Sequence, residues 1–302
     1  MKQYIFSVAL LLATGLIAGC GGSGSTASTA PTAVSGKVAD GYLVGATVFL
    51  DKDSNYQLDA GEPSATTGAG GAYTLKIDSA DVGKYPIVAL ATSGITIDED
   101  TNQPVADSYV LCLPALTVTP STTGAVSGTV SNFISPLSTL IREKMAANPG
   151  MSLTDALTQL RNQMNLPAGI DMMADYVAGS QSGTDATHYQ NMHSIARQMA
   201  GLMSGQAGLV MNGAGVNTNR YRSMMATINT NMPVIAANVN GQGMNSATMI
   251  SMMSTLRAQL GSMSTTGGFA NYSAMFRNMT SHNRFWSNTG VPMNPMGGGM
   301  MR

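Results

Sequence analysis

The chain has 302 residues, of which 44% are hydrophobic and only 10% charged, and its formal net charge at pH 7 is −1. This hydrophobic content can build a core, which excludes a wholly disordered chain, and two cysteines exclude a disulfide-based scaffold. All 16 acidic residues precede residue 186, and the formal charges after it are arginines. An acid-free half can mark a polyanion-binding region, but these arginines are scattered without a basic stripe, so we expect no nucleic-acid binding.

The first residues have the order of an exported protein. Lys2 is followed by an apolar stretch that ends in Ile17-Ala18-Gly19-Cys20. A basic start, an apolar segment and small residues before a cut predict a signal peptide over residues 1–19. The segment resembles the bacterial lipobox, which implies that Cys20 carries the fatty acids of a lipoprotein, including palmitate. The alternatives are an uncleaved anchor and an ordinary signal peptide with an accidental cysteine.

The next segments predict a tether and then β structure. Residues 20–33, rich in Gly, Ser and Thr, predict a flexible tether behind the lipid anchor. Short apolar runs separated by Gly-, Asp- and Asn-rich turns predict an antiparallel β-sandwich over 34–125. The predicted strands are 34–38, 46–50, 72–77, 85–90 and 109–113.

From Ser135 onward the hydrophobic period becomes helical. Ser135 and Ser152 are predicted N-caps, and Pro136 fits the first helical position. Further helices are predicted over 186–204, over 219–238 with a kink at Pro233, and after Asn245, with a short one around Phe269–Phe276. We therefore expect a multi-domain α and β protein, with a helical bundle over 126–280 and a disordered tail over 281–302.

One loop has the spacing of a cation site. Oxygen-bearing side chains recur at alternate positions after the strand 46–50, and a glutamate follows at position 12. This is the spacing by which a 12-residue EF-hand-type loop surrounds a hard cation. The candidate ligands are Asp51, Asp53, Asn55, Gln57 through its backbone carbonyl, Asp59 and Glu62.

The same loop departs from the pattern at position 6. Glycine normally provides the sharp turn there, whereas this chain has Tyr56, and forcing a bulky residue to positive φ costs roughly 1 kcal/mol or more. Weak calcium binding is therefore expected, in the roughly 0.1–1 mM range of extracellular modules. The alternative is a solvated acidic hairpin loop without a specific ligand.

Around this loop the chain resembles a known group of domains. Gly45–Asp51, Gly61-Glu62-Pro63 and Gly71–Leu75 are similar to the B-type repeat domains of bacterial surface proteins. Those domains are Ig-like or transthyretin-like β-sandwiches related to carboxypeptidase regulatory-like domains, and many carry DxDxNxxxDxGE calcium loops. The resemblance covers about residues 34–175 and implies a structural stalk or binding module.

The methionines lie almost entirely in the second half. Of the 24, all except Met1 lie at or after Met145. Most recur at helical spacing, which favours packing in helical cores. The alternative is a site for Cu(I) or Ag(I), which select thioether ligands, and the tail is its best candidate. The tail methionines are Met293, Met296, Met300 and Met301.

No motif of an enzyme class is present, since the chain has no GxSxG, HExxH, P-loop or dinucleotide fingerprint. We therefore expect a non-catalytic, calcium-stabilised protein attached through Cys20 to a bacterial membrane. Gly21 replaces the aspartate that often signals retention in the inner membrane, which favours the outer membrane, on its periplasmic or surface face. It would bind an unidentified envelope or surface protein. The second hypothesis is an envelope protein that handles soft metals, and an unrecognised enzyme ranks third.

Overall fold

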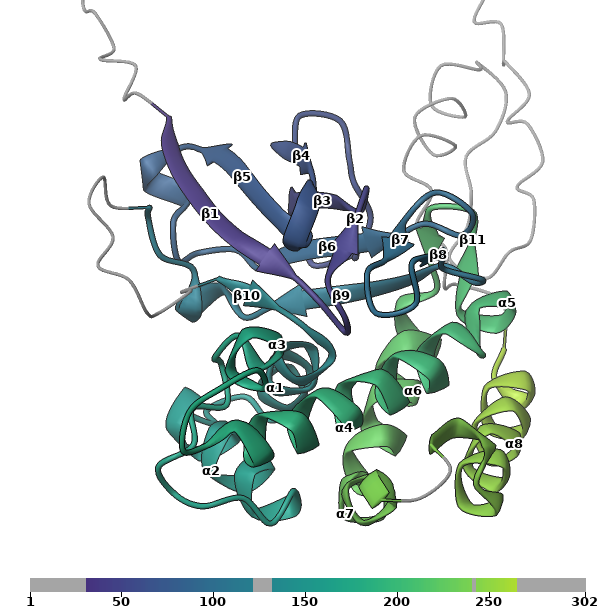
Figure 1. Ribbon diagram of the computed structural model, residues 1–302. Helices are drawn as coiled ribbons and strands as arrows, with labels where there is room; N and C mark the ends of the chain where they lie inside the picture. The colour runs from purple at the N-terminus through teal and green to yellow at the C-terminus, as the bar shows by residue number, and fades with distance from the viewer. Residues whose placement is uncertain (1–30, 122–131, 241–242, 265–302) are drawn as a thin grey trace, which may run out of the picture.

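The computed structural model describes residues 31–121, 132–240 and 243–264. The predicted signal peptide, Cys20, most of the tether and the tail methionines lie outside these ranges. The short helix predicted around Phe269–Phe276 also lies outside them. In Figure 1 the strands form the upper half of the molecule, and most of the helices lie below them.

The first half of the described chain folds into small sheets. A four-stranded antiparallel sheet has the order β4-β3-β6-β9, and a three-stranded sheet has the order β10-β1-β5. The small antiparallel sheet β2-β7-β8 was not predicted. The strands are β1 Thr32–Val38, β2 Leu43–Val44, β3 Thr47–Leu50, β4 Ser64–Thr66, β5 Ala72–Ile77, β6 Ile87–Ala91, β7 Ile97–Asp98, β8 Gln103–Pro104, β9 Tyr109–Leu113 and β10 Phe133–Ile134.

Side-chain alternation explains the clearest of these strands. In β5 exposed and buried residues alternate along its whole length, as the pattern Ala-Tyr-Thr-Leu-Lys-Ile requires of a strand with one face in the core. The turn before it needs glycine. Gly71 has φ +66°, and a Cβ there would lie 2.2 Å from the carbonyl oxygen of Val38.

One pairing differs from the expected antiparallel arrangement. β10 runs parallel to β1, with Val38 opposite Ile134, and it lies beyond residue 125, where the strand-rich region was predicted to end. Two residues are too few to show a period in sequence, so this strand gave no signal. The three-stranded sheet that contains β1 therefore includes a strand from the region 126–280, which was predicted to be helical.

The helices agree closely with their sequence signals. Ser135 and Ser152 cap α1 and α2 through their side chains, and α4 covers the predicted range 186–204. The helix expected over 219–238 is broken at Asn231, just before Pro233, into α6 and α7. The helices are α1 Pro136–Ala147, α2 Leu153–Gln163, α3 Tyr176–Gly179, α4 Ala186–Ser204, α5 Ala207–Val210, α6 Thr218–Thr230, α7 Met232–Ala237 and α8 Ala247–Ser262. A two-stranded hairpin, β11 Met211–Asn212 and β12 Gly215–Val216, lies between α5 and α6.

Side chains of the helical region complete the hydrogen bonds of β9, which lies at the edge of the four-stranded sheet. Thr139 Oγ1 on α1 accepts the Cys112 N–H at 2.8 Å, and Ser138 Oγ donates to the Cys112 carbonyl at 2.7 Å. From α6, the Tyr221 hydroxyl donates to the Val110 carbonyl at 3.0 Å. The edge strand is thereby covered rather than left open to pairing with another chain.

The buried side chains of both halves form one continuous hydrophobic core. Val48 and Leu111 in the sheet, Leu140 in α1 and Met225 in α6 are all fully buried in it. The expected combination of antiparallel strands followed by helices is thus present in a mixed α and β fold. Within the described ranges, none of the helices has the length and apolar character needed to cross a membrane.

Candidate metal centre

The predicted calcium loop connects β3 to β4 and is fastened at both ends. Asp51 follows β3 directly, and its N–H donates to the Pro86 carbonyl at 3.1 Å, which extends the pairing of β3 with β6. Across the loop, the Leu50 N–H donates to the Pro63 carbonyl at 3.1 Å. The two arms of the loop therefore leave the sheet side by side, and their acidic side chains face each other.

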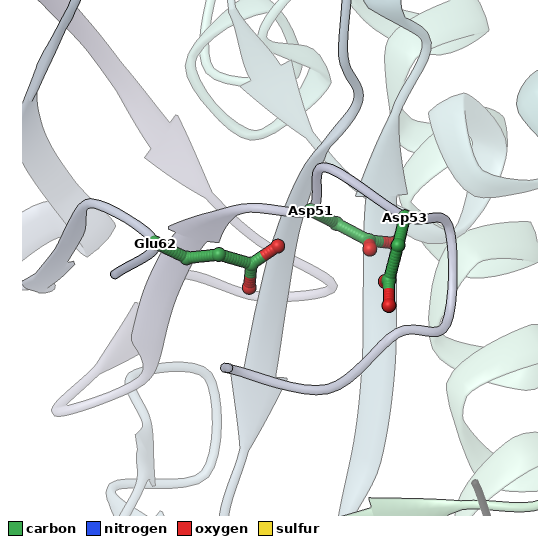
Figure 2. Close-up of side chains that lie close together, drawn as sticks. All are labelled: Asp51, Asp53 and Glu62. Carbon is green, nitrogen blue, oxygen red and sulfur yellow. The ribbon is translucent and has the colours of Figure 1, made fainter. Parts of the chain in front are cut away.

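Three of the predicted ligands come together. Oxygens of Asp51, Asp53 and Glu62 all lie within 4.8 Å of one another. Figure 2 shows Asp51 and Asp53 beside each other on one arm, with the Glu62 carboxylate reaching toward them from the other. Asp51 is buried, Glu62 is half-buried and Asp53 is exposed, so the cluster opens to solvent on one side.

Asn55 joins the fourth carboxylate to this group. Its Nδ2 lies 2.9 Å from Asp53 Oδ2 and 2.7 Å from Asp59 Oδ2. Its Oδ1 accepts the Gln57 N–H at 2.6 Å, so Gln57 belongs to the same turn. The Asn55 amide therefore lies among the acidic groups, at the centre of the loop.

Backbone N–H groups hold the carboxylates in place. Asp51 accepts from Asn55 at 3.1 Å and from Tyr56 at 3.2 Å. Glu62 accepts from Lys52 at 2.6 Å and from Asp59 at 3.0 Å, one bond to each of its two oxygens. Each carboxylate oxygen has a second lone pair, so these bonds orient the side chains and leave them able to bind a cation.

Burial and like charges act on the same acids. Burial is the largest influence on Asp51 and raises its pKa to about 6, with the Glu62 charge adding to the rise. Burial also raises the pKa of Glu62, and the neighbouring Asp59 and Asp53 charges act in the same direction. Crowded carboxylates of this kind favour either a proton or a cation in their midst.

Tyr56, the departure from the calcium-loop pattern, has the positive φ that the pattern requires, at +66°. Its side chain is only 1% exposed and points into the core. The hydroxyl donates to the Glu143 carboxylate, whose oxygens lie 2.9 and 3.0 Å away, and it accepts from Arg222 Nε at 3.3 Å. The ring packs against Tyr221, with the two centroids 4.5 Å apart.

The strained tyrosine thus anchors the loop to α1 and α6. The guanidinium carbon of Arg142 lies 4.3 Å from the Tyr56 ring centroid, and Arg142 also pairs with Glu143. A cost of roughly 1 kcal/mol for positive φ is offset by burial of an aromatic ring together with its hydrogen bonds. Glycine at this position would remove the strain and the anchor together.

The donor set fits a hard divalent cation. Asp51, Asp53 and Glu62 supply clustered carboxylate oxygens, and Asp59 and Asn55 lie next to them. Carboxylate oxygens are ligands of the type that calcium prefers. Asn55 directs its amide nitrogen, not its oxygen, toward Asp53 and Asp59. Lys52, the one base in the loop, pairs instead with Asp81 at 2.7 Å, and its charge is therefore held by an acid outside the cluster.

Sequence reasoning missed the partners of Tyr56. Arg142 and Glu143 lie in α1 and are both buried, although the helical period assigned only apolar residues to the core. The available signal was an adjacent pair of opposite charges inside an otherwise apolar helix, together with a tyrosine where the loop pattern has glycine. Their pairing depends on packing between distant segments, which no local pattern encodes.

Other polar and reactive side chains lie outside the acidic cluster. Cys112 is fully buried, and burial raises the pKa of its thiol, so it packs as a hydrophobic residue. His188 and His193 lie on α4 and do not belong to the acidic cluster in the part of the chain described. Asp100 follows β7 and is close to α4, with its Oδ2 2.7 Å from His193 Nε2.

The described methionines are mainly core residues. Those at 0–1% exposure are Met192, Met199, Met203, Met224, Met225, Met232 and Met249. Burial of these thioethers among other hydrophobic side chains agrees with packing as their role. The four tail methionines that were the better metal candidates lie outside the described residues.

None of the family models, curated proteins or solved structures compared with this chain matches it. The function proposed below is therefore inferred from the loop and its surroundings.

Proposed function

We propose that this chain is a non-catalytic, lipid-anchored protein of the bacterial outer membrane that binds calcium in the loop 51–62. Calcium would stabilise the fold, and the folded part would serve as a structural or partner-binding module. The observation that carries the proposal is the convergence of Asp51, Asp53 and Glu62 within 4.8 Å, in the loop where the ligand spacing predicts it. Three close carboxylates with one buried member gain most from a cation.

The proposed architecture is an Ig-like or transthyretin-like β-sandwich followed by a helical bundle. Burial of inward residues from both larger sheets supports the sandwich, since Val34 and Leu75 of one and Val48 and Val88 of the other are all 0% exposed. The protein partner would be another component of the envelope or cell surface. The soft-metal alternative has no comparable support, since the described methionines are occupied with packing.

Calcium binding is tested by the melting temperature of the purified full chain, with calcium or with a chelator. A dissociation constant of roughly 0.1–1 mM predicts about 1.4–2.7 kcal/mol of stabilisation at about 10 mM calcium. Asp53→Asn should abolish most of the shift, because it removes an exposed ligand charge while an oxygen remains to accept the Asn55 N–H. Asp107→Asn, an exposed acid remote from the loop in sequence, is the matched control and should keep the full shift.

Two results would refute the calcium site: a melting temperature that calcium leaves unchanged, or an Asp53→Asn variant that responds like the parent. Terbium luminescence provides a second measurement, because the buried Tyr56 ring lies in the loop itself. The lipid anchor is tested separately by labelling with a radioactive fatty acid. The label should appear in the parent chain and be lost in Cys20→Ala.

A further inference from the structure

A cleft lies between α1 and α6, next to the anchor of the calcium loop. Its volume is about 280 Å³, and its lining comes from the second half of α1, from Asn148 and from α6 between Arg222 and its last residue. Apolar atoms of Leu140, Ala147, Met225 and Ala226 form part of the lining. The size suits a ligand somewhat smaller than a drug molecule.

Two basic residues line this cleft without an acidic partner. Lys144 is 8% exposed, and within the described part of the chain its Nζ contacts neutral oxygens, Asn229 Oδ1 at 3.1 Å and Gln163 Oε1 at 3.4 Å. Arg222 donates from Nε to the Tyr56 hydroxyl. Among residues 31–121, 132–240 and 243–264, no carboxylate forms an ion pair with either of them.

The acid in the lining, Glu143, is already neutralised. It accepts the Tyr56 hydroxyl and pairs with Arg142. The cleft therefore combines two uncompensated positive charges with neutral amide and hydroxyl groups, from Asn148, Asn229 and Thr230. Burial lowers the pKa of Lys144, as expected for an ammonium group that lacks a counter-charge.

A nearly buried cation without an anion is costly, and a charge-assisted hydrogen bond to an anion is among the stronger polar contacts. We propose that this cleft binds a small organic anion, whose carboxylate or phosphate group contacts Lys144 and Arg222. The apolar part of the ligand would lie against Ala147 and Ala226, with Leu140 and Met225 behind them. This site uses no ligand of the proposed calcium loop, so the two proposals can fail independently.

Fluorine NMR of small aromatic probes tests the proposal, with the full chain in a neutral detergent and a chelator present. The carboxylate probe is 4-fluorobenzoate and the phosphate probe is 4-fluorophenyl phosphate. Neutral 4-fluorobenzyl alcohol has a similar ring without the charge. At least one anionic probe should show saturable line broadening and bind about tenfold or more tightly than the alcohol. The anionic probe that binds more tightly shows whether the site prefers a carboxylate or a phosphate group.

Charge-removing variants locate the site. Lys144→Gln and Arg222→Gln should each lower the affinity for the anionic probe about fivefold or more, because each removes one charge and leaves an amide donor. Lys76→Gln and Arg257→Gln remove exposed charges outside the cleft and should leave binding unchanged. Arg222 is itself exposed, so its variant stays informative if Lys144→Gln fails to fold.

Three results would overturn the anion site. One is the absence of saturable broadening with both anions, and another is equal binding of the neutral alcohol. The third is unchanged binding in a folded Arg222→Gln or Lys144→Gln variant. Because calcium is removed throughout, none of these results depends on calcium binding by the loop 51–62.

Discussion

Asp40 is a nearly buried acid outside the proposed metal centre, with 8% of its surface exposed. Its Oδ2 accepts the Tyr109 hydroxyl at 2.7 Å, while its Oδ1 is buried without a hydrogen-bond partner among the described residues. Burial is the main cause that raises its pKa to about 7, and the charges of Asp98 and Asp100 add to the rise. The protonated form of Asp40 is thus favoured in the folded chain below about pH 7.

This predicts a specific dependence of stability on pH. The unfolded Asp40 loses its proton near pH 4, whereas the folded one keeps it until about pH 7, so the folded state binds more protons between these values. The free energy of unfolding should therefore fall as pH rises from about 4 to about 7, by roughly 1.4 kcal/mol for each unit of pKa difference.

The measurement compares urea unfolding of the parent and Asp40→Asn across this pH range. Asparagine imitates the protonated acid, so the stability of the variant relative to the parent should rise with pH. Contributions from Asp51 and Glu62 cancel in the difference between the two proteins. Asp185→Asn, which changes an exposed acid outside this cavity, should follow the parent, and equal slopes in Asp40→Asn and the parent would contradict the assignment.

At the scale of elements, the loop 51–62 is coupled to two helices through one side chain. Tyr56 reaches Glu143 on α1 and Arg222 on α6, and its ring lies against Tyr221. The loop is thus fastened to the sheet by backbone hydrogen bonds and to the helices by a phenol group. Strain at positive φ is tolerated because the surrounding packing holds the residue there.

The Tyr56 hydroxyl donates to Glu143 and also accepts a hydrogen bond from Arg142. Tyr56→Phe should therefore lower the free energy of unfolding by about 1–3 kcal/mol, because it leaves these buried polar groups without their hydroxyl partner. Urea denaturation followed by circular dichroism measures the loss. Tyr85→Phe is the control, since Tyr85 is half-buried and no hydrogen bond of its hydroxyl is described. A Tyr56→Phe variant as stable as the control would show that the hydroxyl does not anchor the loop.

Elements with a clear period or cap could be predicted from sequence, and those set by tertiary packing could not. The alternation in 72–77, the period in 186–204 and the caps Ser135 and Ser152 all gave correct elements. The spacing of Asp51, Asp53 and Glu62 predicted their convergence. By contrast, β10 and the hairpin β11–β12 have two residues per strand, which is too short for a period to appear.

Prediction of the candidate site from sequence was limited in the same way. Local spacing identified its acids, because loop ligands are close in sequence. The role of Tyr56 depends on Glu143, which is 87 residues away in the chain, and on Arg222, which is 166 away. The sequence indicated the strain at Tyr56 but not the contacts that compensate it.

At the scale of the whole molecule, sheets and helices share a core that has no boundary between the two halves. Leu140 on α1 is fully buried, and its helix packs directly on β9. A continuous core of this kind favours one cooperative transition over stepwise loss of two parts.

Hydrogen exchange should therefore give similar opening free energies for the most protected amides of β9 and of α4. Leu140→Ala should lower both by about 2–5 kcal/mol, since a cavity at the junction weakens the whole unit. Ile250→Ala on the exposed side of α8 is the control, and it should change neither opening free energy by more than a few tenths of a kcal/mol. Retention of parental protection in β9 of Leu140→Ala would indicate two separately unfolding parts.

Helical hydroxyl groups occupy the hydrogen-bonding positions along β9, and this limits how the gene can be rearranged. A fragment that ends at residue 121 would lack Ser138, Thr139 and Tyr221, so its last strand would present bare N–H and C=O groups to solvent. Bare edges recruit strands from neighbouring molecules and lead to oligomers or fibrils. The strand-rich half is therefore poorly suited to recombination with other proteins as a separate domain. The two halves are expected to be inherited together.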